Sequence, residues 1–334
     1  MSEHPAGALI KVSPTRNPAL SGATFDDLLS ELLQRMKEGE TISDEQRIFV
    51  AQELQERLTE ALEVHHNRFS IKNLRDLFWR FHTQLAQKPT IEGASIVELG
   101  SGSHNPLGLL FIFVMLGAKK GIAIDLEQTQ EPARALRSMA RSADVMLLDH
   151  GRIVGNYQVS RAQIEQSLVG FDLPALREGK SSGVDTSRLN FLCESAAETS
   201  IESSSIDIII SNSFFEHLND PEEIIKEMAR ITARGGLSIH AIDCVDHEIY
   251  GDPSCHPLQF LRTSKPGMIN GSNRLRLSEF PALFERHNFE IQEIVPIRKI
   301  EIDDDTHQSF ALPWRAMPRK SLELVQGLIV ARRI

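Results

Sequence analysis

The sequence predicts an α/β protein built around a mainly parallel sheet. Two apolar runs predict neighbouring strands: residues 96–99 end in the glycine-rich turn 100–102, and residues 121–125 end in Asp125. The apolar stretch 107–116 between them is long enough for the helix of a βαβ unit. In such a unit the glycine turn lies at the carboxyl ends of the strands, where backbone approaches a ligand closely. The pattern therefore predicts a nucleoside site, in which Asp125 accepts hydrogen bonds from a ribose diol.

Further apolar runs continue this sheet along the chain. The segment 206–211 is nearly all apolar, as expected for a strand buried on both faces. We expect the helix 221–233 to end at the glycine pair 235–236. The last two strands are expected to form an antiparallel pair at one edge. The complete prediction places strands at 96–99, 121–125, 189–192, 206–211, 237–242, 289–295 and 324–331, and helices at 107–116, 132–140, 221–233 and 280–287.

Composition shifts divide the chain into three parts. Residues 1–22 are rich in Pro, Gly, Ala and Ser, which predicts a flexible tail. Residues 23–90 have helical periodicity and predict an N-terminal helical cap of three helices. Residues 91–334 predict the α/β core. An insertion at about 143–188 fits no βα repeat and is expected to face the substrate.

Charge and composition exclude several function classes. The chain has 334 residues and a formal net charge of −10, which disfavours nucleic acid and anionic membranes as partners. The three cysteines form no CxxC pair, so we expect neither a disulfide framework nor a metal site. No signal pattern opens the sequence, and no apolar run is long enough to span a bilayer. We therefore expect a cytoplasmic protein with a small-molecule substrate, and a homodimer is allowed.

An ordered set of motifs resembles the class I S-adenosylmethionine-dependent methyltransferases, and the resemblance covers roughly residues 92–334. It rests on the set as a whole, because a glycine turn alone is a weak signal. The motifs are Glu98-Leu99-Gly100-Ser101-Gly102, then Asp125, then the segment 205–218 ending in Glu216-His217-Leu218, then Asp220-Pro221, and last Gly235-Gly236. One departure is His104, which stands where the family often has a third glycine.

The resemblance implies a Rossmann-like, doubly wound sheet of seven strands with the last strand antiparallel, and S-adenosylmethionine as the cofactor. It implies that Glu98 holds the glycine turn and approaches the methionine amine. Asn212 and Ser213 are expected beside the methionine part of the cofactor. The cofactor-binding residues so implied are Glu98, Gly100, Ser101, Gly102, Asp125, Leu126, Glu194, Ser195, Ala196, Asn212 and Ser213.

Two histidines at the expected ligand edge are candidate catalytic residues. Methyl transfer needs alignment of the acceptor with the methyl carbon, and a hydroxyl or protonated amine also needs a general base. His217 follows the fourth strand and His247 follows the fifth, and both are suited to that role near neutral pH. Asp246 precedes His247 and is a candidate to support its imidazole. The alternative for His217 is a structural role at the start of a helix.

The segment after the fifth strand predicts substrate contacts. It is similar to stretches in bacterial methyltransferases of polysaccharide and secondary-metabolite gene clusters. Arg274 and Arg276 are candidates to bind a carboxylate or phosphate of the substrate, or else to pair with nearby acids. Tyr250 is a third candidate substrate-binding residue. These features favour methylation of a hydroxyl, or of an amine, on a small molecule or saccharide.

Two other functions remain open at this point. A nicotinamide-dependent oxidoreductase shares the βαβ unit, but Asn105 stands where its fingerprint needs a third glycine. A non-catalytic protein of the same fold that binds a partner is the second alternative. The intact set of Glu98, Gly100, Gly102 and Asp125 argues against loss of the cofactor site.

Overall fold

The computed structural model describes residues 32–39, 41–44, 46–48, 50–51, 54 and 68–334. The predicted tail, most of the first cap helix and much of the second lie outside the described residues. The start of the second cap helix is described. There, Ser43 Oγ accepts from Gln46 N at 3.2 Å and Gln46 Oε1 accepts from Ser43 N at 3.2 Å. This reciprocal pair is a capping box, and it begins the helix.

The chain divides into two compact units, and each is described by itself. One unit contains the described residues up to Phe78 together with residues 132–184, and it is helical. Ser160 and Gln163 form a capping box at the start of one of its helices, a signal that the sequence prediction missed. The predicted insertion at about 143–188 therefore contains helices. The helices of this unit are α3 Ile71–Phe78, α5 Pro132–Asp149, α6 Gly151–Val154, α7 Arg161–Ser167, α8 Leu173–Arg177 and the 3₁₀ turn η2 Ser181–Gly183.

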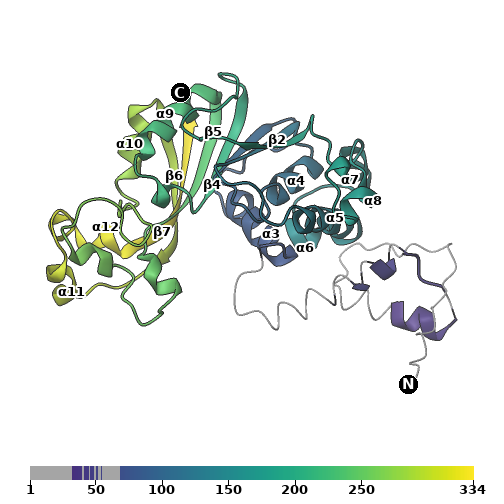
Figure 1. Ribbon diagram of the computed structural model, residues 1–334, viewed down its shortest axis with the longest axis horizontal. Helices are drawn as coiled ribbons and strands as arrows, with labels where there is room; N and C mark the ends of the chain where they lie inside the picture. The colour runs from purple at the N-terminus through teal and green to yellow at the C-terminus, as the bar shows by residue number, and fades with distance from the viewer. Residues whose placement is uncertain (1–31, 40, 45, 49, 52–53, 55–67) are drawn as a thin grey trace. The chain divides into compact units, whose positions relative to one another are not determined.

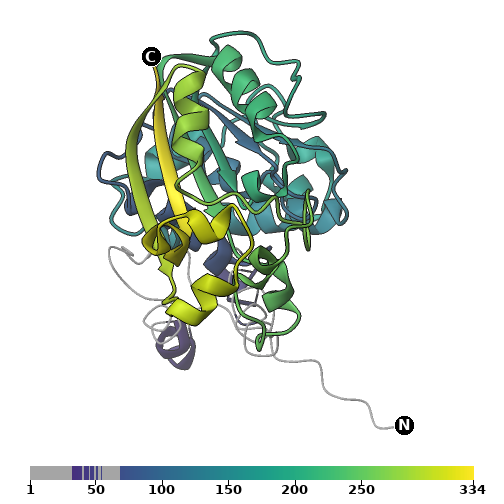
Figure 2. The same ribbon diagram turned by 90° about the vertical axis from the view of Figure 1, so that its left-hand side faces the viewer.

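The second unit, residues 79–131 and 185–334, holds the sheet. The described residues form one sheet of seven strands in the order β3-β2-β1-β4-β5-β7-β6. β1 to β5 pair in parallel, and β7 is antiparallel to both β5 and β6. Figure 2 shows the yellow β7 beside the yellow-green β6 at that edge. The strands are β1 Ser95–Leu99, β2 Lys120–Asp125, β3 Leu189–Cys193, β4 Ile206–Asn212, β5 Thr232–Asp243, β6 Phe289–Lys299 and β7 Leu324–Arg333.

The predicted seven-stranded sheet with its last strand antiparallel is therefore confirmed, and one detail of it is wrong. The glycine pair 235–236 lies inside β5 and does not end the preceding helix, α9 Pro221–Ile231. The helix ends earlier because Thr232 adopts extended backbone, with ψ 130°, and pairs with Ile206 of β4.

Helices cover both faces of the sheet. On one face, α4 Gly108–Met115 packs so closely that a Cβ at Gly121 of β2 would lie 3.0 Å from Leu110. The opposite face carries Val97 and Leu99, which join one hydrophobic core with residues of α9 and of α10 Phe280–Arg286. Figure 1 shows α10 beside β6. Both faces are thus apolar, as the continuous apolar runs of the parallel strands predicted.

The loops that follow β5 and β6 have a small hydrophobic core of their own. Val245, Leu258 and Phe260 after β5 pack with Phe310 and Leu322 from the connection between β6 and β7. Figure 1 shows α11 and α12 gathered at one end of β7. These loops are therefore fixed beside the carboxyl end of β5. Their helical turns are η4 His247–Tyr250, η5 Gln259–Arg262, α11 Asp304–Ser309, η6 Trp314–Ala316 and α12 Arg319–Glu323.

Candidate functional site

The glycine turn after β1 is tied to the end of β2. Gly100 and Gly102 have φ values of +62° and +76°, which glycine adopts without strain. Asp125 Oδ2 accepts a hydrogen bond from Gly102 N at 2.8 Å, and Asp125 Oδ1 accepts one from Glu127 N at 3.0 Å. Because a carboxylate offers about four lone-pair positions, Asp125 keeps capacity for further donors.

Phe214 lies directly against this turn. A Cβ at Gly100 would come within 2.2 Å of the Phe214 ring, so residue 100 needs to be glycine for two reasons, its φ and this contact. The ring follows Ser213, which has a φ of +50° just after β4. The sequence prediction missed Phe214, because no local pattern shows that β4 would bring it to the turn after β1.

Two buried polar groups belong to the same turn. Glu98 is 6% exposed, and its burial together with the negative charge of Asp125 raises the pKa of Glu98 to about 8. Ser101 Oγ is buried and has no hydrogen-bond partner within the described part of the chain. A buried polar atom without a partner costs free energy, so it indicates a place where a ligand supplies the missing hydrogen bond.

The carboxyl ends of β2 and β3 lie side by side. The thiol of Cys193, at the end of β3, donates to the carbonyl of Leu126 at 3.4 Å. The Leu126 side chain is 75% exposed and is therefore accessible to a ligand at this edge. Ala196, after β3, is buried.

Glu194 and Ser195 bond within their own loop. Glu194 Oε1 accepts from Ser200 N at 2.9 Å, and Ser195 Oγ accepts from Ala197 N at 3.2 Å. Their observed contacts therefore shape the loop after β3, where the resemblance places cofactor-binding residues.

At the end of β4, the side-chain oxygen of Asn212 accepts a hydrogen bond from the Arg80 guanidinium. Arg80 lies on the short π-helical turn η1 Trp79–Thr83, more than a hundred residues away in sequence. The sequence prediction did not single out Arg80, since only the fold brings it to β4. Ser213, next in the chain, is exposed and donates its N–H to the Ala241 carbonyl at 2.9 Å.

Two histidines meet at the carboxyl ends of β4 and β5. His217 ends the 3₁₀ turn η3 Phe215–His217, and His247 begins η4. Their ring centroids are 4.9 Å apart. One ligand atom each from Glu216, His217 and His247 lies within 4.8 Å of the others. The fold therefore brings together two predicted catalytic residues and one carboxylate beside them.

The His217 ring is held by a backbone carbonyl. Its Nδ1 lies 2.8 Å from the Gly271 oxygen, so in the neutral ring Nδ1 carries the proton and Nε2 has a free lone pair. Asn273 holds the turn on which His217 sits, because its side-chain amide donates to the Phe215 and Leu218 carbonyls at 2.8 and 3.0 Å.

Carboxylates surround the histidines. Burial, reinforced by the charge of Asp243, raises the pKa of Glu216 to about 8. Tyr250 donates its hydroxyl to Asp243 and is 61% exposed. Asp246 is fully buried and accepts from Asn270 Nδ2 at 2.8 Å, while also capping η4.

The observed partners of Arg274 and Arg276 are backbone carbonyls. Arg274 is 5% exposed, donates to the carbonyls of Thr263, Lys265 and Gly267, and stacks on a Trp ring. Arg276 is completely buried and donates to the Cys244 carbonyl. These contacts favour a structural role in fixing the loop after β5 over the predicted binding of a substrate anion.

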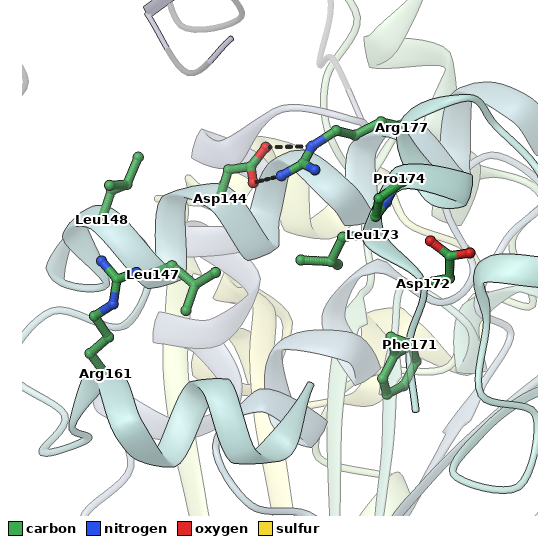
Figure 3. Close-up of a pocket in the computed structure, with 9 residues that line it drawn as sticks. All are labelled: Asp144, Leu147, Leu148, Arg161, Phe171, Asp172, Leu173, Pro174 and Arg177. Carbon is green, nitrogen blue, oxygen red and sulfur yellow. Dashed lines mark hydrogen bonds and ion pairs between the residues drawn. The ribbon is translucent and has the colours of Figure 1, made fainter. Parts of the chain in front are cut away.

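The helical unit contains a separate pocket of about 590 Å³, shown in Figure 3. Three of its charged lining residues are in ion pairs, and the fourth, Asp172, caps α8 by accepting from Ala175 N at 3.1 Å. Arg177 Nη2 lies 2.5 Å from Asp144 Oδ1, and Arg161 Nε lies 2.7 Å from Glu165 Oε1. Because these charges are neutralised by each other, we place the candidate site at the sheet edge instead.

Residues 148–240 match a protein family described as a methyltransferase domain. The matched range ends within β5 and includes β4 and η3, but it starts after the glycine turn and Asp125. Among curated proteins, none matches the sequence.

Solved structures of methyltransferases are similar to this chain at low identity. One from Mesorhizobium loti is 15% identical, covers 73% of this chain and 93% of its own, and has a TM-score of 0.39. One from Methanosarcina mazei is 17% identical, with 73% and 93% covered and a TM-score of 0.38. A geranyl diphosphate C-methyltransferase from Streptomyces coelicolor A3(2), solved with Mg²⁺, geranyl diphosphate and S-adenosyl-L-homocysteine, is 12% identical, with 81% and 86% covered and a TM-score of 0.43.

The domain match and the sheet order confirm the resemblance to class I methyltransferases, and the cofactor is S-adenosylmethionine. The residues present fit it. The turn at Gly100 and Gly102 exposes backbone, Ser101 has a buried hydroxyl without a partner, and Asp125 keeps acceptor positions. The domain match favours a methyltransferase over the nicotinamide-dependent oxidoreductase that the sequence left open. No helix of the described residues is long and apolar enough to cross a membrane.

Proposed function

We propose that this class I S-adenosylmethionine-dependent methyltransferase methylates a hydroxyl, or an amine, of a small molecule or saccharide that binds beside His217 and His247. The observation that carries the proposal is the meeting of these two rings, 4.9 Å apart, where β4 and β5 end. In open α/β sheets, ligands bind at this edge.

For the cofactor, the proposal assigns the residues around the glycine turn and the ends of β2, β3 and β4. Asp125 accepts from the ribose hydroxyls, Leu126 flanks the adenine, and Asn212 faces the methionine part. Arg80, which bonds to Asn212, adds a positive charge suited to the methionine carboxylate. When bound, S-adenosylmethionine supplies a methyl group attached to a positively charged sulfur. The sulfur is the leaving group and keeps the electron pair of the carbon–sulfur bond.

The histidines supply the proton acceptor in this proposal. Burial, with the neighbouring His217 as a second cause, lowers the pKa of His247 below its usual range, so its ring is neutral at physiological pH. A neutral imidazole accepts the proton of an acceptor hydroxyl as the oxygen attacks the methyl carbon. The exposed Tyr250 is proposed as a substrate contact, held in place by Asp243.

Isothermal titration calorimetry with S-adenosylmethionine, S-adenosylhomocysteine and a nicotinamide dinucleotide tests the cofactor site. We expect binding of the first two only. A methyl-transfer screen of hydroxyl and amine acceptors then tests the substrate class, with His247→Ala as the variant. We expect this variant to lose turnover while its affinity for S-adenosylhomocysteine stays unchanged. Turnover equal to that of the parent would remove His247 from the mechanism.

A further inference from the structure

We propose that Glu216, His217 and His247 bind a divalent transition-metal ion, and that this ion holds the acceptor oxygen for methyl transfer. The sequence predicted no metal site, because the ligands stand on two separate turns and match no metal-binding spacing. The fold brings one ligand atom from each of the three residues within 4.8 Å of the others.

The donor set matches a known type of metal site. Two imidazole nitrogens and one carboxylate oxygen suit zinc and its first-row neighbours, and three protein ligands leave a position open for a substrate. Ligands of a tetrahedral ion with bonds of about 2.0–2.1 Å lie roughly 3.3 Å apart. The ligand atoms must therefore move from within 4.8 Å of one another to about this separation. The side chains have room for this movement, because His217 is exposed and His247 is half-buried.

The state of Glu216 is an independent observation that points to a cation. Its side chain is 1% exposed, and its Oε1 accepts a long hydrogen bond, 3.3 Å, from Asp243 N. Its Oε2 is buried and has no hydrogen-bond partner among the residues described. A buried carboxylate oxygen without a donor is costly, and a cation beside it removes that cost.

The support around His217 has the arrangement that metal-binding histidines use. Such a histidine donates one ring N–H to a carbonyl or carboxylate, which fixes the ring and leaves the other nitrogen for the metal. Here the Gly271 carbonyl lies 2.8 Å from Nδ1, and Asn273 clamps the turn from the same loop. Nε2 of His217 is thereby the nitrogen available to the ion.

The metal site rests on the proposed function and deepens it toward oxygen acceptors. With the ion bound, both imidazoles are its ligands, so the ion replaces His247 in activating the acceptor hydroxyl. A bound divalent ion lowers the pKa of a coordinated hydroxyl, so its proton passes to solvent water. The oxygen then forms a bond with the methyl carbon while the carbon–sulfur bond breaks. The electron pair of that bond goes to sulfur, which becomes the neutral thioether of S-adenosylhomocysteine.

Cobalt(II) titration of the full chain, after treatment with a chelator, tests the site by its visible absorption spectrum. We expect one equivalent to bind, with the d–d bands of nitrogen and oxygen ligands. Glu216→Gln and His247→Gln are each expected to weaken Co²⁺ binding by more than the roughly 10–100-fold that loss of a ligand's hydrogen-bond partner costs, since each removes a ligand itself. His287→Gln is the matched control, because that histidine lies beyond α10 and pairs with Glu222.

The same samples are titrated with S-adenosylhomocysteine, which reports on the cofactor site and on folding. Loss of Co²⁺ binding with unchanged S-adenosylhomocysteine affinity supports the metal site. A parent chain that binds S-adenosylhomocysteine but gives no Co²⁺ spectrum overturns the metal site and leaves the proposed methyltransferase function standing. Variants that bind Co²⁺ as the parent does also overturn it. Failure of the parent to bind S-adenosylhomocysteine counts against the proposed function instead.

Discussion

At the residue scale, the cofactor site depends on a few polar groups held close together by backbone. Asp125 connects the end of β2 with the turn after β1 through its bond to Gly102 N. Glu98 is buried just before the same turn, and the negative charge of Asp125 helps to raise its pKa. Hydrogen bonds thus position the Asp125 carboxylate, whereas burial favours the uncharged form of the Glu98 carboxyl group.

Asp125→Ala is expected to weaken S-adenosylmethionine binding by roughly 1.5–3 kcal/mol, because it removes a charged acceptor from buried hydroxyls. Isothermal titration calorimetry measures the change. Glu127→Ala is the control, since the Glu127 side chain is exposed and adjacent. Unchanged affinity in Asp125→Ala would remove this residue from the site.

Glu98→Gln is expected to stabilise the protein at high pH when no cofactor is added. The pKa of Glu98 is about 8 in the folded chain against 4.5 for an exposed glutamate, so its contribution to stability is full below pH 4.5 and is lost as pH rises through 8. Glutamine does not titrate, so the variant does not lose stability in this way. The free energy of unfolding of the variant, relative to that of the parent, should rise by roughly 2–5 kcal/mol between pH 4.5 and 9. Denaturant unfolding at several pH values measures it, and parallel curves for the two proteins would contradict the assignment.

At the element scale, short turns after β4 and β5 position the candidate chemistry. η3 and η4 are too short to be stable alone, so other segments must hold them. Asn273 holds η3 in place. Its side-chain amide donates to the Phe215 and Leu218 carbonyls, and its backbone N–H donates to the Glu216 carbonyl at 2.8 Å. The loop after β5 therefore determines where His217 lies.

Asn273→Ala is expected to lower the free energy of unfolding by about 1–3 kcal/mol, because it removes the side-chain donor of two partly buried carbonyls. It should also reduce turnover more than it reduces S-adenosylhomocysteine affinity, since η3 carries His217 whereas Asp125 holds the glycine turn through its own bond to Gly102 N. Thermal unfolding and calorimetry measure the two effects. The exposed Asn219 provides a matched control, for which Asn219→Ala should change stability by no more than about 0.5 kcal/mol.

At the scale of the whole molecule, a buried histidine joins the two central strands. His240 of β5 is completely buried, with Ser211 Oγ of β4 2.8 Å from Nδ1 and Ser238 Oγ 2.6 Å from Nε2. Burial lowers the pKa of His240 to about 3, so the ring is neutral whenever the sheet is folded near physiological pH. The neutral ring satisfies both hydroxyls within the core.

His240→Gln tests the acid sensitivity of the fold. Because the folded pKa is lowered, the contribution of His240 to stability is full above pH 6.5 and is lost as pH falls toward 3. The parent should therefore lose roughly 1–4 kcal/mol relative to the variant between pH 7 and pH 4. The difference between the two stability curves isolates this histidine from the buried glutamates, which act in the opposite direction. A constant difference across that range would show that His240 does not titrate on unfolding.

The sequence alone determined the sheet and the cofactor edge. Apolar runs ending in Gly100 and Asp125, and the apolar strand before Asn212, carry their own periodicity, so strand positions and their ligand ends follow from local pattern. The last strand's direction came from the resemblance, and the antiparallel pairing of β7 with β5 and β6 confirms it. Where a local pattern had two solutions, as at the glycine pair 235–236, the pairing of Thr232 with β4 decided the outcome.

Only the tertiary structure decided which side chains meet. Phe214 against Gly100, Arg80 on Asn212, and Glu216 beside His247 join residues from different strands and turns, with no spacing in the sequence that relates them. The bonds of Arg274 and Arg276 to backbone carbonyls could not be predicted from the sequence either. Charged side chains are usually exposed, and only the packing shows that these two are buried. Periodicity fixes backbone locally, whereas contacts between distant segments depend on how the strands are ordered in the sheet.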